Sequence, residues 1–231
     1  MALNPPRHSG EGRNPGPIPL PPAVFLAGLA GVLALEGVTF LVPRSPEVAV
    51  HMAVLGAVRL AQASWILAVA WRLSREEFPF GLARSQWLRG LTRGALWCLA
   101  FGLLAGVGML ALGLLGQDPT RMLHSRLPES PAGLLLFVSV GTLLAPLAEE
   151  FFFRGLVYGY FRRWGVAAAL LVSTVVFVLP HLPGARVPLT QAVGGVVFAL
   201  AYEKEKNLLV PILIHATGNL ALFAISWVGR S

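Results

Sequence analysis

The sequence predicts an all-α membrane protein: a polytopic helix bundle with about seven transmembrane helices and an interfacial helix between the second and the third. Of the 231 residues, 55% are hydrophobic and only 13% are charged, whereas a soluble domain carries about 25% charged residues. The mean hydropathy is +0.69. The apolar residues also gather in runs long enough to cross a bilayer, which takes about 20 residues in a helix.

The N-terminal half divides into a tail and three spans. Residues 1–20 contain five prolines and are predicted to form a disordered tail. Residues 21–130 hold spans at about 21–42, 48–73 and 91–115. Between the second and third spans, residues 74–89 mix aromatic and basic side chains, as expected of a segment lying in the membrane interface.

The C-terminal half, residues 131–231, is predicted to be the catalytic core and to contain four further spans. We expect them at about 132–160, 166–179, 189–202 and 208–228. A tight turn is predicted around Arg162, Arg163 and Gly165. The charged run Glu203–Lys206 is predicted to be a solvated turn without a functional role.

The net charge of +7 is interpreted as membrane topology, because the basic residues lie between apolar runs. Seven spans would place eleven Arg and Lys residues on the side of the N-terminal tail and five on the other side. The richer side is expected to be cytoplasmic, which puts the N-terminus inside and the C-terminus outside. We expect an integral protein of a bacterial inner membrane, with the lipid bilayer and no nucleic acid as a partner.

Two adjacent carboxylates and an arginine, Glu149, Glu150 and Arg154, interrupt the fourth span. A charge at mid-bilayer costs roughly 2.5–3.5 kcal/mol on insertion scales, so these side chains are expected to face protein or water. Glu150 and Arg154 are four residues apart and can form an ion pair on one helix face. Glu149 points about 100° away and is free for another role. The simpler interpretation is an ion pair that only fixes packing.

Two later spans add His181, His215 and Asn219. Glu149 lies 15 residues before the turn at Trp164 and His181 lies 17 after it. At 1.5 Å per residue both are roughly 22–26 Å from that turn, and therefore at matching depths. His215 and Asn219 are four residues apart and share a face. We expect the polar groups of these three spans to meet in one pocket.

This set of groups suits hydrolysis of a carbonyl bond. A carboxylate and an imidazole at one depth can hold a water and take its proton, and a histidine with an asparagine can donate hydrogen bonds to an oxyanion. Inside a membrane the expected substrate is a peptide bond. Glu149, His181 and His215 could instead ligate zinc. The sequence has no HExxH motif, so the catalytic water alone is expected to suffice.

The motifs Glu149-Glu150-x-x-x-Arg154, Phe177-x-x-x-His181 and His215-x-x-x-Asn219 resemble those of the CAAX protease and bacteriocin-processing (CPBP, or Abi) intramembrane proteases. The resemblance covers about residues 131–222. It implies that Glu149 is a base that activates water with His181, and that Glu150 and Arg154 orient the site. His215 and Asn219 would bind the oxyanion or position the water.

The resemblance implies a glutamate-type, metal-free endopeptidase, although family members have also been called metalloproteases. Its substrate would be a C-terminal or leader segment of a membrane-associated or exported protein. Two features depart from the family: Pro180 precedes the second motif's histidine, and seven spans are predicted where eukaryotic prenyl-protein members have eight.

Two other functions stay open at the level of the sequence. One is a non-catalytic membrane immunity or scaffold protein. The other is a proton-coupled transporter, although no half-repeats are visible and the polar residues cluster in the C-terminal half. Glu36 and Arg59, in the first two spans, are predicted to form a structural ion pair rather than a proton relay.

Overall fold

The computed structural model describes residues 19–41, 47–73, 79–118, 125–182 and 188–229, and these ranges contain helices and no strand. Three long helices come first: α1 (Pro22–Leu41), α2 (Val48–Leu73) and α3 (Trp87–Leu114). A continuous helical segment then runs over Pro131–Trp164. After it come α7 (Val166–Val178), α8 (Leu189–Glu205) and α9 (Leu209–Val228). The predicted all-α membrane bundle is confirmed.

In the described ranges five helices are long and apolar enough to span a bilayer, and these are α1, α2, α3 with the 3₁₀ turn before it, Pro131–Trp164 and α9. The fifth predicted span is a shorter apolar helix over Val166–His181. The sixth corresponds to α8, which has 17 residues and ends in charged side chains. The chain is therefore an integral membrane protein with five helices of spanning length in the described ranges and two shorter ones.

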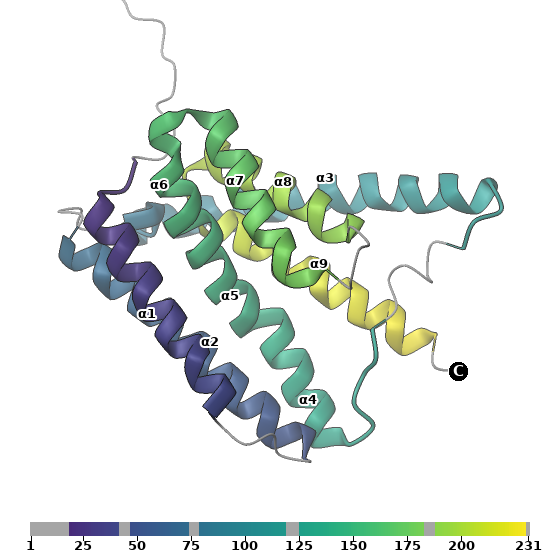
Figure 1. Ribbon diagram of the computed structural model, residues 1–231. Coiled ribbons are helices and arrows are strands. Elements are labelled where there is room, and N and C mark those ends of the chain that lie inside the picture. The colour runs from purple at the N-terminus through teal and green to yellow at the C-terminus, as the bar shows by residue number, and fades with distance from the viewer. Residues whose placement is uncertain (1–18, 42–46, 74–78, 119–124, 183–187, 230–231) are drawn as a thin grey trace, which may run out of the picture.

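The segment Pro131–Trp164 is the central helix of the bundle (Figure 1). It passes between the α1–α2 pair and the group formed by α7, α8 and α9. Helix α3 packs against α9 near its own N-terminus and then extends away from the other helices. Its buried residues are the two glycines of its first turns, Gly90 and Gly94, so most of its length is left to face lipid.

The central helix is interrupted by two π-helical segments and ends in a 3₁₀ turn. It consists of α4 (Pro131–Ser139), a π-helical turn η4 (Val140–Leu144), α5 (Ala145–Glu150), a second π segment η5 (Phe151–Tyr158), α6 (Gly159–Phe161) and the 3₁₀ turn η6 (Arg162–Trp164). The predicted turn follows at Gly165, where φ is +102°. Since π turns are frequent at functional sites, both segments draw attention to the carboxylates between them.

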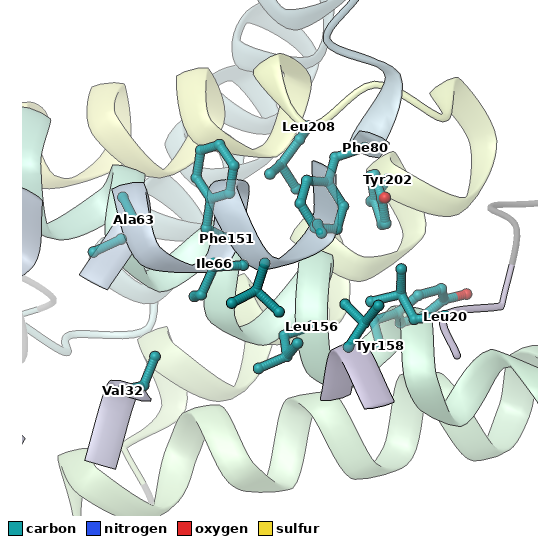
Figure 2. Close-up of a cluster of buried hydrophobic side chains, with 14 of the residues drawn as sticks. Leu20, Val32, Ala63, Ile66, Phe80, Phe151, Leu156, Tyr158, Tyr202 and Leu208 are labelled. Carbon is teal, nitrogen blue, oxygen red and sulfur yellow. The ribbon is translucent and has the colours of Figure 1, made fainter. Parts of the chain in front are cut away.

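The main core lies where the central helix meets α1 and α2 (Figure 2). Leu156 and Ile66 are fully buried there. Gly28 of α1 lets the two helices approach, because a Cβ at that position would lie 2.7 Å from Leu156 Cδ1. Small residues at helix contacts are the usual means of close packing in membranes, where the hydrophobic effect does not drive association.

The predicted interfacial helix is replaced, over residues 79–86, by two single 3₁₀ turns, η1 (Pro79–Gly81) and η2 (Arg84–Gln86); residues 74–78 lie outside the described ranges. Phe80 is buried rather than interfacial, and its carbonyl accepts a hydrogen bond from Leu208 N–H at 3.1 Å. Its positive φ of 65° breaks any regular helix. The Phe80 backbone is therefore held at the α8–α9 junction, and its ring packs edge-on against Phe151 in the core.

The predicted solvated turn at Glu203–Lys206 is wrong, because α8 continues to Glu205. Glu203 accepts hydrogen bonds from Tyr158 Oη at 2.7 Å and from the Arg162 guanidinium at 2.9 Å. Glu205 is buried and accepts one from Trp97 Nε1 at 3.1 Å. Glu203 thus joins α8 to the central helix, and Glu205 joins α8 to α3. The charged residues around them in the sequence gave no indication of these contacts.

The N-terminal tail lies outside the described residues up to position 18, but its predicted end is wrong. Leu20 is buried. Its N–H donates to the carbonyl of Gly159 at 3.0 Å, and its carbonyl accepts a hydrogen bond from Arg163. The chain just before α1 is therefore anchored on the end of the central helix.

The segments predicted to share the cytoplasmic side do gather at one end of the bundle. Arg162 pairs with Glu203, Arg93 with Glu205, and Asn207 Nδ2 donates to the carbonyl of Gln86. The predicted pair of Glu36 and Arg59 is confirmed at 2.7 Å between α1 and α2.

Candidate active site

Glu150 and Arg154 form the predicted ion pair at the centre of the bundle. Arg154 Nη1 lies 2.9 Å from Glu150 Oε1, and both side chains are fully buried. Arg154 Nη2 also donates to the carbonyl of Gly195 on α8 at 3.0 Å. The guanidinium lies 4.7 Å from the Phe177 ring centroid and 5.1 Å from that of Phe198. Such aromatic faces favour a desolvated cation, so the pair is enclosed by protein on every side.

His215 joins the same carboxylate from α9. Its Nδ1 lies 2.8 Å from Glu150 Oε1, and its ring stacks on Phe198 with centroids 4.8 Å apart. Phe177 contacts the ring edge-on. Because a carboxylate paired with arginine only accepts hydrogen bonds, the hydrogen of this contact lies on Nδ1. The imidazole is therefore fixed in orientation, with Nε2 turned away from Glu150.

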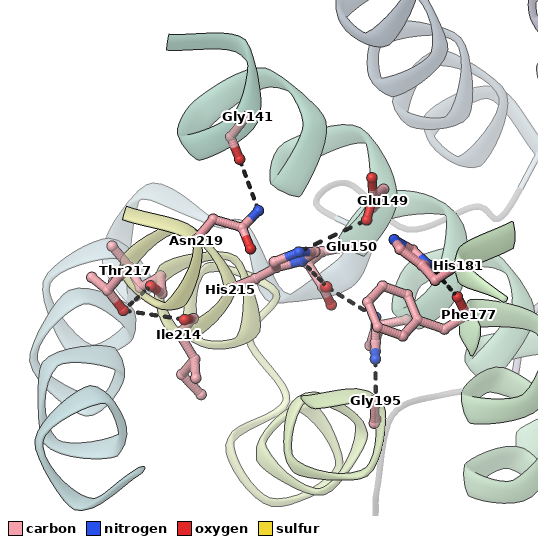
Figure 3. A network of polar contacts seen from close by, with 12 residues as sticks. Gly141, Glu149, Glu150, Phe177, His181, Gly195, Ile214, His215, Thr217 and Asn219 are labelled. Atoms are coloured by element: carbon pink, nitrogen blue, oxygen red, sulfur yellow. Dashed lines mark hydrogen bonds and ion pairs between the residues drawn. The ribbon is translucent and has the colours of Figure 1, made fainter. Parts of the chain in front are cut away.

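Glu149 approaches the other ring nitrogen of His215 (Figure 3). Its Oε2 is 3.8 Å from His215 Nε2, and its side chain keeps 24% of its surface exposed while that of Glu150 is fully buried. A polar separation above 3.5 Å is the kind that a water can bridge. Of the two neighbouring glutamates, Glu149 is thus the one that a water or a substrate can reach.

His181 lies in the 3₁₀ turn η7 (Leu179–His181), which follows α7. Its Nδ1 is 2.8 Å from the carbonyl of Phe177, which fixes the hydrogen on that nitrogen. Figure 3 shows His181 in the same part of the site as Glu149. The expected partnership is nevertheless different: among the described residues the histidine paired with Glu149 is His215, whereas the hydrogen bond of His181 goes to Phe177.

Asn219 shares a face with His215, as the spacing of four predicts. Its Nδ2 donates to the carbonyl of Gly141, in the first π segment, at 2.8 Å. Glu149, Glu150, Arg154 and His215 are linked in one set of contacts, whereas Asn219 contacts the central helix separately, at Gly141. The side-chain amide of Asn219 is therefore already hydrogen-bonded within the protein, to Gly141.

Glu149, His181 and His215 are the candidate zinc ligands. In the described ranges no three His, Cys, Asp or Glu side chains are grouped closely enough to hold one ion. Glu150 binds His215 Nδ1, and the carbonyl of Phe177 binds His181 Nδ1. These contacts orient each ring so that its Nε2 atom points away from that partner. The Nε2 atom of His215 lies 3.8 Å from Glu149 Oε2.

The sequence analysis did not identify three residues that contact the site residues and support them from the protein interior. Gly195 supplies a carbonyl to Arg154, Phe198 supplies the surface under His215, and Gly141 receives Asn219. Of these three residues, only Phe198 could have been recognised from the sequence, because it is an aromatic residue one helical turn after the Gly194–Gly195 pair. Backbone carbonyls leave no trace in sequence, since every residue has one.

Comparison with known proteins places these contacts in a family. Residues 131–221 match the family model described as type II CAAX prenyl endopeptidase Rce1-like. This match and the two relatives described below support the CPBP family that the three motifs resemble. The CPBP region contains the site residues, from Glu149 in the central helix to Asn219 in α9.

Two bacterial relatives are similar over this region. The membrane-embedded CAAX protease MroQ of Staphylococcus aureus is 33% identical over 91 residues, which is 36% of this chain and 36% of MroQ. The putative membrane peptidase YdiL of Bacillus subtilis is 31% identical over 85 residues, 36% of this chain and 34% of YdiL. The CPBP similarity thus spans about a third of either relative. No solved structure matches the chain significantly.

Proposed function

We propose that this protein is an intramembrane endopeptidase that hydrolyses a peptide bond at or near the membrane. The observation that carries the proposal is the 3.8 Å separation between Glu149 Oε2 and His215 Nε2, on an imidazole locked by a buried carboxylate. Two acceptors at this spacing suit the two hydrogens of one water. The CPBP match and the two relatives named as a protease and a peptidase support the same reaction.

In the proposed reaction Glu149 is the general base. The water between Glu149 and His215 gives a proton to the Glu149 carboxylate while its oxygen bonds to the carbonyl carbon of the substrate. The tetrahedral intermediate then collapses, the C–N bond breaks, and the proton passes from Glu149 to the leaving amine. General base catalysis of this kind contributes about 10²–10⁴-fold to the rate.

His181 is assigned to the oxyanion. Its Nε2 is the ring nitrogen that can face the oxygen that becomes negative, because Nδ1 is already bound to the carbonyl of Phe177. Removing one such donor typically costs about 10²–10³-fold in rate. His215 keeps the water in place, which exchanges the roles that the sequence alone gave to the two histidines.

Glu150 and Arg154 act from behind the reacting groups. Both are inaccessible, with side chains fully buried, so neither contacts the substrate. Glu150 holds His215 at 2.8 Å, while the charge of Arg154 balances that of Glu150. Preorganised charges of this kind need no rearrangement during the reaction.

The substrate is proposed to be a C-terminal or leader segment of a membrane-associated or exported protein. Glu149 lies on a membrane-spanning helix, so a scissile bond must enter the bilayer region to reach it. The organisms of the two relatives support a bacterial plasma (inner) membrane as the location. The gathering of Arg93, Arg162 and Lys204 at one end of the bundle supports a cytoplasmic placement of that end.

The test compares wild-type protein with Glu149→Gln in cells and in proteoliposomes. Substrates are found by comparing the C-termini and N-termini of membrane and secreted proteins from the two strains, and the peptides found are then assayed with purified protein. We expect cleavage to require Glu149, with Glu47→Gln as a control variant far from the site. Cleavage that survives Glu149→Gln would remove the general base and favour a non-catalytic scaffold.

A further inference from the structure

The carbonyl of Gly141 has lost its partner within the central helix. In the first π segment, Ala145 N–H donates to the carbonyl of Val140, five residues earlier, as π geometry requires. The next donor in this ladder would be residue 146, which is Pro146 and has no N–H. The carbonyl of Gly141 therefore points out of the helix without a main-chain donor in this ladder.

Asn219 supplies the missing donor from another helix. Its Nδ2 lies 2.8 Å from the carbonyl oxygen of Gly141, and a carbonyl can be faced only by the NH₂ end of an amide. Figure 3 shows the amide oxygen turned away from Gly141. Glycine at position 141 lets α9 pack close to the central helix, because a Cβ there would lie 2.8 Å from the ring of Phe223 on α9.

The π segment also decides which glutamate faces His215. One extra residue in a helix turns everything after it by about 100°, which is the angle between neighbouring residues. Glu149 and Glu150 follow the π segment directly, on α5. A helix without the extra residue would therefore carry Glu149 to the face that Glu150 now occupies, and would turn Glu150 away from His215.

We propose that Asn219 is a positioning residue: it donates to Gly141 the hydrogen bond that Pro146 withholds, and so fixes the register that presents Glu150 to His215 Nδ1 and Glu149 to the reacting water. The proposal rests on the proposed protease function for its catalytic consequence, but not for its structural content. It gives Asn219 an effect on the central helix in place of contact with the oxyanion.

A double-mutant cycle tests the proposal, because Pro146→Ala restores an N–H at position 146. Cleavage of one peptide and the unfolding temperature in detergent are measured for wild type, Asn219→Ala, Pro146→Ala and the double variant. We expect Asn219→Ala alone to lower kcat tenfold or more. In the Pro146→Ala background the same change should cost less than threefold in kcat, with a matching recovery of the unfolding temperature.

A matched control is Thr217→Val, on the same helix. Thr217 Oγ1 contacts the carbonyl of Leu213 in α9 at 2.8 Å and Cys98 Sγ of α3 at 3.2 Å, and these partners lie outside the π segment. Its effect should be small and equal in both backgrounds. An equal loss of kcat for Asn219→Ala with and without Pro146 would overturn the proposal and return Asn219 to the oxyanion.

The unfolding temperature of Asn219→Ala alone decides the question if Pro146→Ala does not fold. A lost interhelical hydrogen bond should lower it by at least about 2 °C, whereas a side chain that meets only the oxyanion would leave it unchanged. This readout needs no catalysis. Failure of the protease proposal, seen with Glu149→Gln, is thus distinguishable from failure of the positioning proposal.

Discussion

His215 Nδ1 and Glu150 Oε1 lie 2.8 Å apart inside the bundle, and the same oxygen lies 2.9 Å from Arg154 Nη1. One buried carboxylate oxygen therefore serves both an imidazole and a guanidinium. This arrangement separates the two adjacent glutamates by role. Glu150 is a fixed internal anion that orients a histidine, and Glu149 is the accessible carboxylate beside that histidine.

The buried pair should be expensive to break. In Arg154→Ala, Glu150 would remain as a buried anion without its arginine, and such changes cost about 3–5 kcal/mol. We expect a lower unfolding temperature in detergent, together with strongly reduced cleavage. Arg93→Ala is the control, because the Arg93 side chain is half exposed where it meets Glu205, and exposed pairs contribute about 0–1 kcal/mol. Equal losses in the two variants would contradict the enclosed pair.

Removing either histidine should stop the reaction without removing the protein from the membrane. His215→Ala takes away one of the two groups that hold the water, and we expect about 10²–10⁴-fold slower cleavage. His181→Ala takes away the proposed oxyanion donor, with about 10²–10³-fold loss. His51→Ala, at an exposed position on α2, should match wild type. Full activity in either site variant would remove that histidine from its assigned role.

The proposed mechanism predicts that chelators leave cleavage unchanged. Glu149 and His215 face each other across a gap suited to water, and the described residues offer no three-ligand cluster for an ion. The measurement is the cleavage rate of purified protein after dialysis against EDTA and 1,10-phenanthroline, with a known zinc protease treated in parallel. Activity that disappears and returns on adding zinc would favour the metalloenzyme.

The charge distribution predicts the C-terminus to be outside the cell and the N-terminus inside. A reporter active only in the cytoplasm should therefore be inactive when fused after Ser231 and active when fused before Met1. A periplasmic reporter should give the opposite result. The structure sharpens this test, because α7 and α8 are shorter than a full span. A cytoplasmic C-terminal reporter would mean an even number of crossings.

Much of the site could be predicted from the sequence, because the spacing of residues within one helix depends only on local geometry. Spacing of four placed Glu150 with Arg154 and His215 with Asn219, and the cost of intramembrane charge singled out the motif. Composition and long apolar runs determined the membrane bundle. None of these inferences needed knowledge of which helices are neighbours.

Tertiary structure decided everything that depends on contacts between distant segments. It paired Glu149 with His215 instead of His181, drew Phe80 into the core, and turned Glu203 into a link between helices. It also placed Asn219 on a carbonyl left open by a π turn. The physical reason is that a backbone carbonyl or a helix register has no side-chain signature, so its partner is known only once the helices have packed.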